Sequence, residues 1–580
     1  MLIRDNTRLR SFHGLYEIWF SAPETDYWPL SWTLLWLEWH LWDDQTVGYH
    51  LASLGLHLIS AFLIWRLLSK LGLRWGWVGG LLFVLHPLAV ESVAWMSEIK
   101  NTLSLPLFLL SLEALIETDE TNSPWAYGRS FLLYLAAMLA KTSVIALPFV
   151  FLLYCWWKRA RIAWSDFRKI IPFLILAVIL GLITLGLQHI HTPDTLADLA
   201  INSRGPLTRL MGAGMAIFFY LGKFIWPVEL LPIYPRWPID SLSLLEFATI
   251  PLLALLFFGC WTQRHRWGRH ALLGLGFFVL TLLPVLGFFK MSYLSISWVA
   301  DHLAYLSLVG LIGLAVAGME RAYRLLSVRT DRTDTTIRYG KVLSVANFGS
   351  LALLFLILIL LAAQSRSYAA RFSNGESLFS YDVHTDPSNW LAYNYLGLSL
   401  KESNRVPEAI PQFEMALQLR PNSAELHYNL ACALASANRL PEAIDQFRES
   451  LKLDPHAAQT YDDWGAALVQ EGKATEAMTY FENAIRINPR FAQAHNDLAN
   501  AFLSAGQYPE AISEYEKAIQ IEPDVAVLHL NLGALLEKLD RKVEAFKQFE
   551  IVLRLDPDNQ PAKRSLDLLS QSVPANSDEH

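Results

Sequence analysis

Ionisable and amide side chains flank a proline, Pro87, at the end of an apolar run early in the chain. They are His86, Glu91, Glu98, Lys100 and Asn101. An ionised group at membrane depth costs about 2.5–3.5 kcal/mol on insertion scales, so such groups are candidates for function. Pro87 should break the helix, and Glu91 would then point into the space that the break opens. Alternatively, Glu91 caps a helix or pairs with Lys100.

Two further polar positions interrupt apolar sequence. Lys141 lies inside an otherwise apolar hairpin, and Asp301, His302 and Tyr305 begin another apolar run. A buried cation suits a phosphate group, because a charge-assisted hydrogen bond is strong there. Lys141 could equally pair with Glu91 or with Asp301.

These residues require membrane-spanning helices to position them. The chain is 53% hydrophobic and only 17% charged, whereas soluble proteins carry about 25% charged residues. Apolar runs near the length that crosses a bilayer, about 20 residues, recur along the first two thirds of the chain. They are 48–68, 76–95, 100–117, 125–141, 143–157, 170–189, 207–226, 246–262, 270–288, 302–320 and 342–363.

Basic loops predict the orientation of these helices, because Lys and Arg stay on the cytoplasmic side. The basic clusters are Lys70 and Arg74; Lys158, Arg159, Arg161, Arg168 and Lys169; Arg264, Arg266 and Arg269; and Arg321, Arg324, Arg329, Arg332, Arg338 and Lys341. Placing all four inside leaves the loops 86–101, 190–206 and 288–302 outside. One of the runs 170–189, 207–226 and 246–262 must then fail to span, and 207–226 is the expected exception.

The first 47 residues form an extracytoplasmic or interfacial segment in this interpretation. Met1 to Asp26 holds no apolar run long enough for a secretory signal. Trp28, Trp32, Trp36 and Trp39 share one helical face. Tryptophan favours the membrane–water boundary, so a helix lying on the membrane is expected. A platform for stacking a ligand is the alternative.

The last third of the chain repeats every 34 residues. The repeated positions are Pro387, Pro421, Pro455, Pro489, Pro523 and Pro557; Ala409, Ala443, Ala477, Ala511 and Ala545; Phe413, Phe447, Phe481, Tyr515 and Phe549; and Gly397, Ala431, Gly465, Ala499 and Gly533. This period and pattern predict tetratricopeptide repeats, each a pair of antiparallel helices. A single unit cannot bury its apolar face, but five stacked units can.

The first helices of such a solenoid line a concave groove that binds protein or peptide. Asn429, Asp463, Asp497 and Asn531 occupy one equivalent groove position. Their side chains could hold an extended peptide backbone, or they are merely polar helix residues. The region 387–571 carries a net charge of −9, and the remainder is near +2. This balance gives no electrostatic basis for nucleic-acid binding. The three cysteines predict no disulfide framework.

Several short motifs, in their order along nearly the whole chain, resemble one known family. They are Tyr27-Trp28-Pro29-Leu30-Ser31; Gly48-Tyr49-His50-Leu51 with His57; His86-Pro87 through Glu91 to Lys100-Asn101; Lys141-Thr142 to Leu147-Pro148; Trp226-Pro227 to Tyr234-Pro235; and Asp301-His302 to Tyr305-Leu306. Followed by tetratricopeptide repeats, this set resembles the transmembrane and tetratricopeptide-repeat-containing O-mannosyltransferases and their bacterial relatives.

The resemblance implies a GT-C-type membrane glycosyltransferase that uses a polyprenyl-phosphate sugar on the outer face of the membrane. Such chemistry needs a carboxylate to take a proton from the acceptor hydroxyl and basic groups to steady the leaving phosphate. The family's acidic pair lies at the end of a first helix, and residues 1–6 look like the piece just after it. Glu91 and Asp5 are therefore the candidate catalytic acids in this sequence.

The remaining site residues follow from the same resemblance. The expected phosphate contacts are Lys100, Lys141, His302 and Tyr305, and the further site candidates are His86, Glu98, Asn101 and Asp301. No cofactor and no metal ligands are predicted, and a need for a divalent metal stays open. The expected partners are the lipid bilayer, a polyprenyl-phosphate sugar and a protein or peptide in the solenoid groove.

The sequence thus predicts an all-α chain with a polytopic, GT-C-like transmembrane bundle followed by a tetratricopeptide-repeat solenoid. The expected boundaries are 1–47, a transmembrane domain at 48–364, a linker at 365–386, the solenoid at 387–571 and a disordered tail at 572–580. The expected location is a bacterial inner membrane with the solenoid extracytoplasmic. The rival hypotheses are a non-catalytic membrane scaffold and a flippase for lipid-linked sugars.

Overall fold

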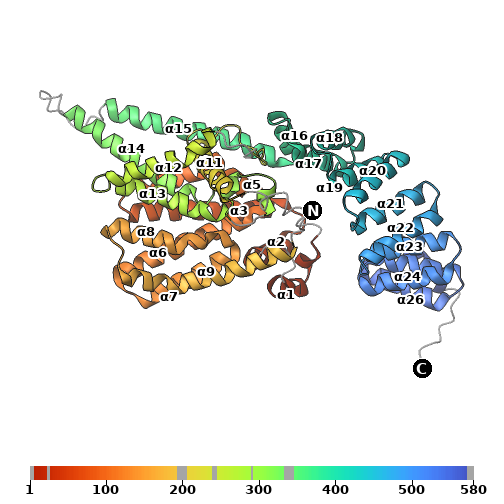
Figure 1. The fold of residues 1–580 in the computed structure, drawn as a ribbon. Helices are drawn as coiled ribbons and strands as arrows, with labels where there is room; N and C mark the ends of the chain where they lie inside the picture. Colours follow the sequence, from red (N-terminus) through yellow and green to blue (C-terminus); the bar gives the residue numbers. More distant parts are fainter. Residues whose placement is uncertain are drawn as a thin grey trace. The chain divides into compact units, whose positions relative to one another are not determined.

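The computed structural model describes residues 6–21, 27–191, 205–237, 244–288, 292–331 and 345–570. All the regular secondary structure of these residues is helical. The chain divides into two compact units, Met1–Asp386 and Pro387–His580 (Figure 1). The predicted fold class, an apolar helical bundle followed by tetratricopeptide repeats, is confirmed. Asp5 and the tail 572–580 lie outside the described residues.

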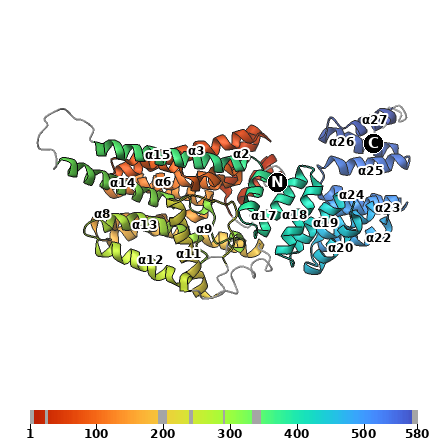
Figure 2. The ribbon, with the colours of Figure 1, turned by 90° about the horizontal axis from the view of Figure 1, so that it is seen from above.

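The first unit, called the membrane unit below, is a bundle of long helices that run side by side (Figure 2). Its helices are α1 (Phe12–Phe20), α2 (Pro29–Trp42), α3 (Thr46–Lys70), α4 (Gly76–Leu85), α5 (Val90–Ala94), α6 (Ile99–Thr121), α7 (Pro124–Ala140), α8 (Leu147–Arg159), α9 (Trp164–His191), α11 (Pro206–Ile225), α12 (Leu244–Thr262), α13 (Gly268–Leu282), α14 (Leu308–Asp331), α15 (Val345–Ala369) and α16 (Gly375–Thr385).

Five described segments are long and apolar enough to cross a membrane. They are Thr46–Lys70, Met96–Thr121, Trp164–Leu187, Gly268–Val285 and Leu351–Ser373. A sixth candidate is the pair Gly76–Leu85 and Pro87–Ala94, which bends by 61°. The bend falls at His86, where Pro87 begins a new helical turn. Proline lacks an N–H and cannot continue the preceding helix, so the predicted break is confirmed.

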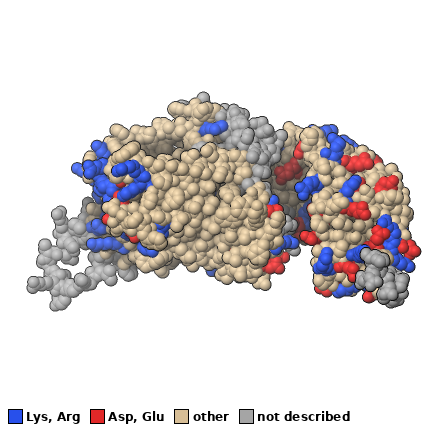
Figure 3. All heavy atoms as spheres, turned by 90° about the horizontal axis from the view of Figure 1, so that it is seen from below, with Lys and Arg blue, Asp and Glu red and all other residues tan. Residues whose placement is uncertain are grey.

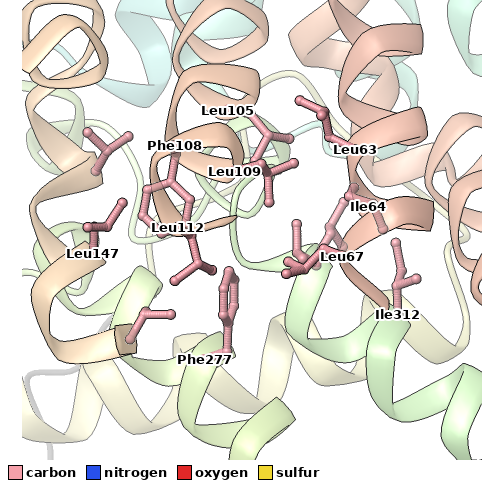
Figure 4. Close-up of a cluster of buried hydrophobic side chains, with 14 of the residues drawn as sticks. Leu63, Ile64, Leu67, Leu105, Phe108, Leu109, Leu112, Leu147, Phe277 and Ile312 are labelled. Atoms are coloured by element: carbon pink, nitrogen blue, oxygen red, sulfur yellow. The ribbon is translucent and has the colours of Figure 1, made fainter. Parts of the chain in front are cut away.

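Apolar side chains from α3, α6, α8, α13 and α14 fill the centre of the bundle. Figure 4 shows Ile64 on α3, Phe108 on α6, Leu147 on α8, Phe277 on α13 and Ile312 on α14 in one cluster. Within a bilayer, such packing stabilises by close contact rather than by release of water. The bundle is therefore a rigid support for the polar residues at its ends.

Lys141 separates two helices that form a tight hairpin. α7 ends at Ala140, Lys141 is extended, and a short 3-10 turn leads into α8 at Leu147. α7 also packs closely along α6, where the hydroxyls of Ser111 and Ser130 each donate to the other residue's backbone carbonyl. The expected hairpin is therefore present, with Lys141 at its tip.

α11 differs from the long apolar helices. It is absent from the described helices that are long and apolar enough to span. Gly212 lies against Trp298, and the Tyr220 hydroxyl donates to the Ala300 carbonyl at 2.9 Å. Two points of α11 eight residues apart therefore touch one short segment, 298–300. That 207–226 does not cross the membrane stays a prediction from the sequence.

Two further segments pack against other parts of the membrane unit. The tryptophan face of α2 is partly buried against the N-terminal helices: the Trp36 indole donates to the Ser11 carbonyl at 2.9 Å, and Arg10 lies over Trp39. The predicted linker 365–386 is helical and belongs to the membrane unit. Its Tyr368 is fully buried, which explains why this stretch is not an open connection.

Basic residues gather at one end of the membrane unit (Figure 3). Next to them in this view lies a wide surface without Lys, Arg, Asp or Glu. Arg159 there bonds to Asp119 at 2.8 Å and lies 2.7 Å from Asp166. Lys169 and Lys158 also contact Asp119. This end corresponds to the basic loops of the sequence.

The second unit is a solenoid of paired helices. They are α17 (Trp390–Glu402), α18 (Val406–Leu419), α19 (Ala424–Ser436), α20 (Leu440–Leu453), α21 (Ala458–Gln470), α22 (Ala474–Ile487), α23 (Ala492–Ser504), α24 (Tyr508–Ile521), α25 (Ala526–Lys538) and α26 (Lys542–Leu555), with α27 (Gln560–Ser570) at the end. Each first helix packs on the second helix of its own repeat, as the 34-residue period predicts.

A small residue is required where the two helices of a repeat cross. A Cβ atom added to Gly465 would lie 2.6 Å from the Phe481 ring, and one on Gly397 would lie 2.7 Å from Phe413. The aromatic ring therefore occupies the space that a larger side chain would need.

Gly465→Leu should destabilise the solenoid by about 1–3 kcal/mol, because the Phe481 ring cannot leave a close-packed interior. Urea unfolding of the polypeptide 387–580 would measure this change. Gly465→Ala is the matched control and should cost much less, since alanine stands at the equivalent positions 431 and 499. Equal losses for the two variants would contradict this account of the crossing.

Candidate active site and peptide groove

Glu91 and His302 form a buried pair that joins α5 to the segment before α14. The His302 backbone N–H donates to Glu91 Oε2 at 2.9 Å, and His302 Nδ1 lies 2.7 Å from Glu91 Oε1. Glu91 is fully buried and His302 is 8% exposed. An ionised Glu91 requires the proton on His302 Nδ1, which leaves Nε2 free to accept. Among the described residues His302 makes its hydrogen bonds through its backbone N–H and Nδ1, and none involves Nε2.

Asp301, beside His302 in the chain, is held by two phenols. Tyr234 donates to Asp301 Oδ1 at 2.9 Å, and Tyr368 donates to Oδ2 at 3.2 Å. All three side chains are buried. These bonds tie the proline-rich segment after α11 and the end of α15 to the same point. Asp301 is therefore a structural anchor whose oxygens are already engaged.

Glu98, Lys100, Asn101 and Lys141 form a second polar group around the start of α6. Lys100 Nζ lies 3.0 Å from Glu98 Oε1 and 4.5 Å from the centre of the Trp28 ring. The Asn101 amide donates to Glu98 Oε2 at 2.6 Å, and Lys141 Nζ donates to Asn101 Oδ1. Two ammonium groups are thus held close to one buried carboxylate, where a second anion could pair with them.

Two further histidines, His57 and His86, are buried in the membrane unit near these polar groups. His57 Nδ1 lies 2.8 Å from the Tyr305 hydroxyl, and both residues are buried. His86 caps the turn after the helix break, accepting from the Leu88 N–H, and its Nε2 lies 3.1 Å from the Phe224 carbonyl oxygen. His86 therefore fixes the bend that presents Glu91.

The sequence-predicted residues of the membrane unit thus meet at one end of the bundle. They are His86, Glu91, Glu98, Lys100, Asn101, Lys141, Asp301, His302 and Tyr305. Asp5 lies outside the described residues. The sequence did not single out Tyr368 or Glu38, and it did not pair Tyr234 with Asp301. Only the proline-rich motif around Tyr234 could have pointed to one of them.

Glu38 on α2 is an unusual buried acid. It is 1% exposed, and neither carboxyl oxygen has a hydrogen-bond partner among the described residues. Burial raises the pKa of Glu38 to about 8. A buried carboxyl without a partner is least costly when it is protonated. Glu38 therefore suits the donation of a hydrogen bond better than the acceptance of a proton.

One cluster in the described residues has the spacing of metal ligands. Asp119, Cys155 and Asp166 lie within 4.8 Å of one another. Arg159 occupies the position of a cation between the two carboxylates. The cluster lies at the basic end of the bundle, away from Glu91 and His302. The Arg159 guanidinium therefore supplies the positive charge that pairs with Asp119 and Asp166.

The four predicted groove residues bond to neighbouring repeats or helix turns. The Asn429 amide donates to Asn394, and the Asn531 amide donates to Asn496, each across one repeat. Asp463 accepts from Tyr428 at 2.7 Å, and Asp497 accepts from Gln493 at 2.8 Å. The Asn429 and Asn531 amides are therefore engaged between repeats, and the Asp463 and Asp497 carboxylates are half-buried acceptors of neighbouring side chains.

Glu91→Ala should destabilise the membrane unit by about 3 kcal/mol, because it leaves two buried donors of His302 unpaired. Thermal unfolding in detergent would show a clear drop in melting temperature. Glu117→Ala is the control: it breaks an exposed pair with Arg129 at the other end and should change little. A melting temperature that is the same for Glu91→Ala and the native chain would contradict the proposed pairing.

Asp462 should make solenoid stability depend on pH. Burial, together with the Asp497 and Asp463 carboxylates, raises the pKa of Asp462 to about 8. The unfolded chain ionises at a lower pH, so stability should fall as pH rises from about 4 to 8. Urea unfolding of residues 387–580 should show a smaller fall for Asp462→Asn. Parallel pH profiles for the two proteins would refute this assignment.

Comparisons with known proteins cover both units. Tetratricopeptide-repeat models match residues 360–424, 396–458, 468–514 and 499–540. Protein O-mannosyl-transferase Tmtc3 of Drosophila melanogaster is 23% identical over 522 residues, covering 74% of this chain and 53% of that protein. The chain therefore spans about half the length of this relative.

Solved structures of tetratricopeptide-repeat proteins resemble about a third of the chain. The tetratricopeptide-repeat protein YrrB is 18% identical over 34% of this chain and 98% of its own, with a TM-score of 0.27. PilF of Pseudomonas aeruginosa is 20% identical over 33% and 94%, with a TM-score of 0.28. With the Tmtc3 match, the repeats confirm the resemblance of this chain to the transmembrane and tetratricopeptide-repeat-containing O-mannosyltransferases.

Proposed function

We propose that the membrane unit is a glycosyltransferase that moves a hexose, such as mannose, from a polyprenyl-phosphate donor to a protein hydroxyl. The observation that carries this proposal is the meeting of Glu91–His302 with Lys100 and Lys141 at one end of an apolar bundle. Such groups are costly at membrane depth and are retained for function. The similarity to a named O-mannosyltransferase supports the reaction class.

In this proposal Lys100 and Lys141 steady the phosphate of the donor. The bond between the anomeric carbon and the phosphate oxygen breaks, and the phosphate leaves with the electron pair. Ammonium groups held in a site of low polarity stabilise that developing charge. Both lysines are mostly buried, and Asn101 and Glu98 fix their positions.

His302 accepts the proton of the acceptor hydroxyl as that hydroxyl attacks the anomeric carbon. Glu91 has both oxygens engaged by His302, so it acts by holding the proton on Nδ1 and orienting the ring. A carboxylate that orients an imidazole in this way is a common arrangement for general bases. This role for His302 replaces the phosphate contact expected from the sequence, and Glu91 becomes a positioning residue.

The reaction takes place on the extracytoplasmic side in this proposal. The basic end of the bundle is cytoplasmic by the loop-charge rule, and the polar cluster lies at the other end. α15 reaches that end, where Ser365 bonds to the Leu85 carbonyl. The solenoid then follows on the same side of the membrane, in agreement with a role in binding the acceptor or a partner protein.

Purified chain in lipid nanodiscs, supplied with polyprenyl-phosphate mannose, should release polyprenyl phosphate when an acceptor peptide is added. Lys141→Met and His302→Gln should each lower the rate at least about 100-fold, because each removes a group used in the transition state. Lys70→Met, at the basic end and paired with Glu120, is the matched control and should keep the rate.

Two other functions predict different results in that experiment. A non-catalytic scaffold would consume no donor under any condition, and that result would overturn the proposal. A flippase would move the lipid-linked sugar across the bilayer without breaking its glycosidic bond. Intact donor that changes leaflet would therefore favour the flippase.

A further inference from the structure

The first helices of the solenoid lie on its inner side. Consecutive first helices touch one another: α17 contacts α19, α19 contacts α21, and α21 contacts α23. Consecutive second helices make no comparable contact in the described residues. The closer set of helices marks the concave side of a curved stack. The side chains of α19, α21 and α23 on this side are called the groove below.

The groove is acidic over three successive repeats. α19, α21 and α23 contain no lysine and no arginine. They carry Glu425, Asp462, Asp463 and Asp497 instead. Histidines of the same helices turn away from the groove: His427 and His495 bond to Gln446 and Glu514 on the second helices.

The outer helices show a different charge pattern. Arg405 pairs with Glu408, Arg439 with Glu442 and Arg541 with Glu544. These exposed pairs neutralise one another along the second helices. α19, α21 and α23 differ from these second helices in that they carry acidic side chains and no lysine or arginine.

Asp462 lies beneath the groove, where further carboxylates surround it. It is 2% exposed, and its Oδ1 is enclosed with no hydrogen-bond partner among the described residues. Its closest charged neighbours are the carboxylates of Asp497 and Asp463, both of which disfavour its ionisation. A buried carboxyl oxygen left unpaired is costly unless a donor supplies the missing bond. A hydrogen-bond donor from a bound peptide would supply it, and a positive charge on that donor would offset the neighbouring Asp463 and Asp497 carboxylates.

We propose that the groove binds an extended, basic peptide segment, with lysine or arginine side chains paired to Asp463 and Asp497. This inference deepens the solenoid part of the proposed function by naming the chemistry of its partner. Packed helices lie about 8–10 Å apart, and an extended chain advances about 3.3 Å per residue. Basic side chains two or three residues apart therefore match carboxylates one repeat apart.

The test is a binding titration of full-length chain in nanodiscs of uncharged lipid, without sugar donor. The probe is a fluorescent ten-residue peptide with lysine at alternate positions, compared with one carrying glutamine there. We expect saturable binding of the lysine peptide that weakens with salt. The double variant Asp463→Asn, Asp497→Asn should bind at least about 10-fold more weakly, because it loses two charge-assisted hydrogen bonds.

The control removes two carboxylates from the outer helices with Glu442→Gln and Glu544→Gln, and it should leave the affinity unchanged. Equal weakening by the two double variants, or equal binding of the glutamine peptide, would overturn the inference. The result is independent of catalysis. Peptide binding without donor turnover would contradict only the proposed enzymatic activity. Donor turnover without peptide binding would contradict only this inference.

Discussion

The contact between Glu91 and His302 holds the polar end of the membrane unit together. Glu91 follows a helix break, and His302 precedes α14, so the pair connects two parts of the chain 211 residues apart. Both partners are buried, and neither could be left unpaired at low cost. The helix break at Pro87 makes this pairing possible, because it turns Glu91 toward the backbone and ring of His302.

Other bonds extend from this contact in a short network. Asp301 accepts hydrogen bonds from the hydroxyls of Tyr234 and Tyr368. These bonds bring the segment after α11 and the end of α15 to the same place. Glu98, Lys100, Asn101 and Lys141 form the neighbouring network at the start of α6 and the tip of the α7–α8 hairpin. Fully satisfied buried networks position their members tightly. The site is therefore prearranged by the fold rather than assembled from flexible loops.

The repeats were the most predictable part of the chain. A fixed 34-residue spacing of Pro, Ala and Phe determines helix pairs, because each recurring residue has a local structural role. The helix break at Pro87 and the hairpin at Lys141 were also readable, since each depends on neighbouring residues. The packing of the segment 365–386 was not readable, because Tyr368 bonds to Asp301, which lies 67 residues away in the sequence.

Long-range pairing explains the remaining differences at the site. The sequence named Glu91 and His302 separately, but it could not show that both oxygens of Glu91 are used by one residue. Glu38 was missed because a single acid among tryptophans carries no motif. The sequence left open whether the groove amides hold a peptide, and in the structure Asn429 and Asn531 bond to adjacent repeats. Such contacts depend on the stacking geometry of the solenoid, which spacing alone does not provide.

A structure of the full chain with bound polyprenyl phosphate tests the central claim most directly. The account predicts the phosphate at the polar end of the bundle, within about 3 Å of the Lys141 or Lys100 ammonium, with His302 facing the adjacent space. A phosphate bound instead among the basic residues around Lys158 and Arg159, with the polar cluster unchanged, would contradict it.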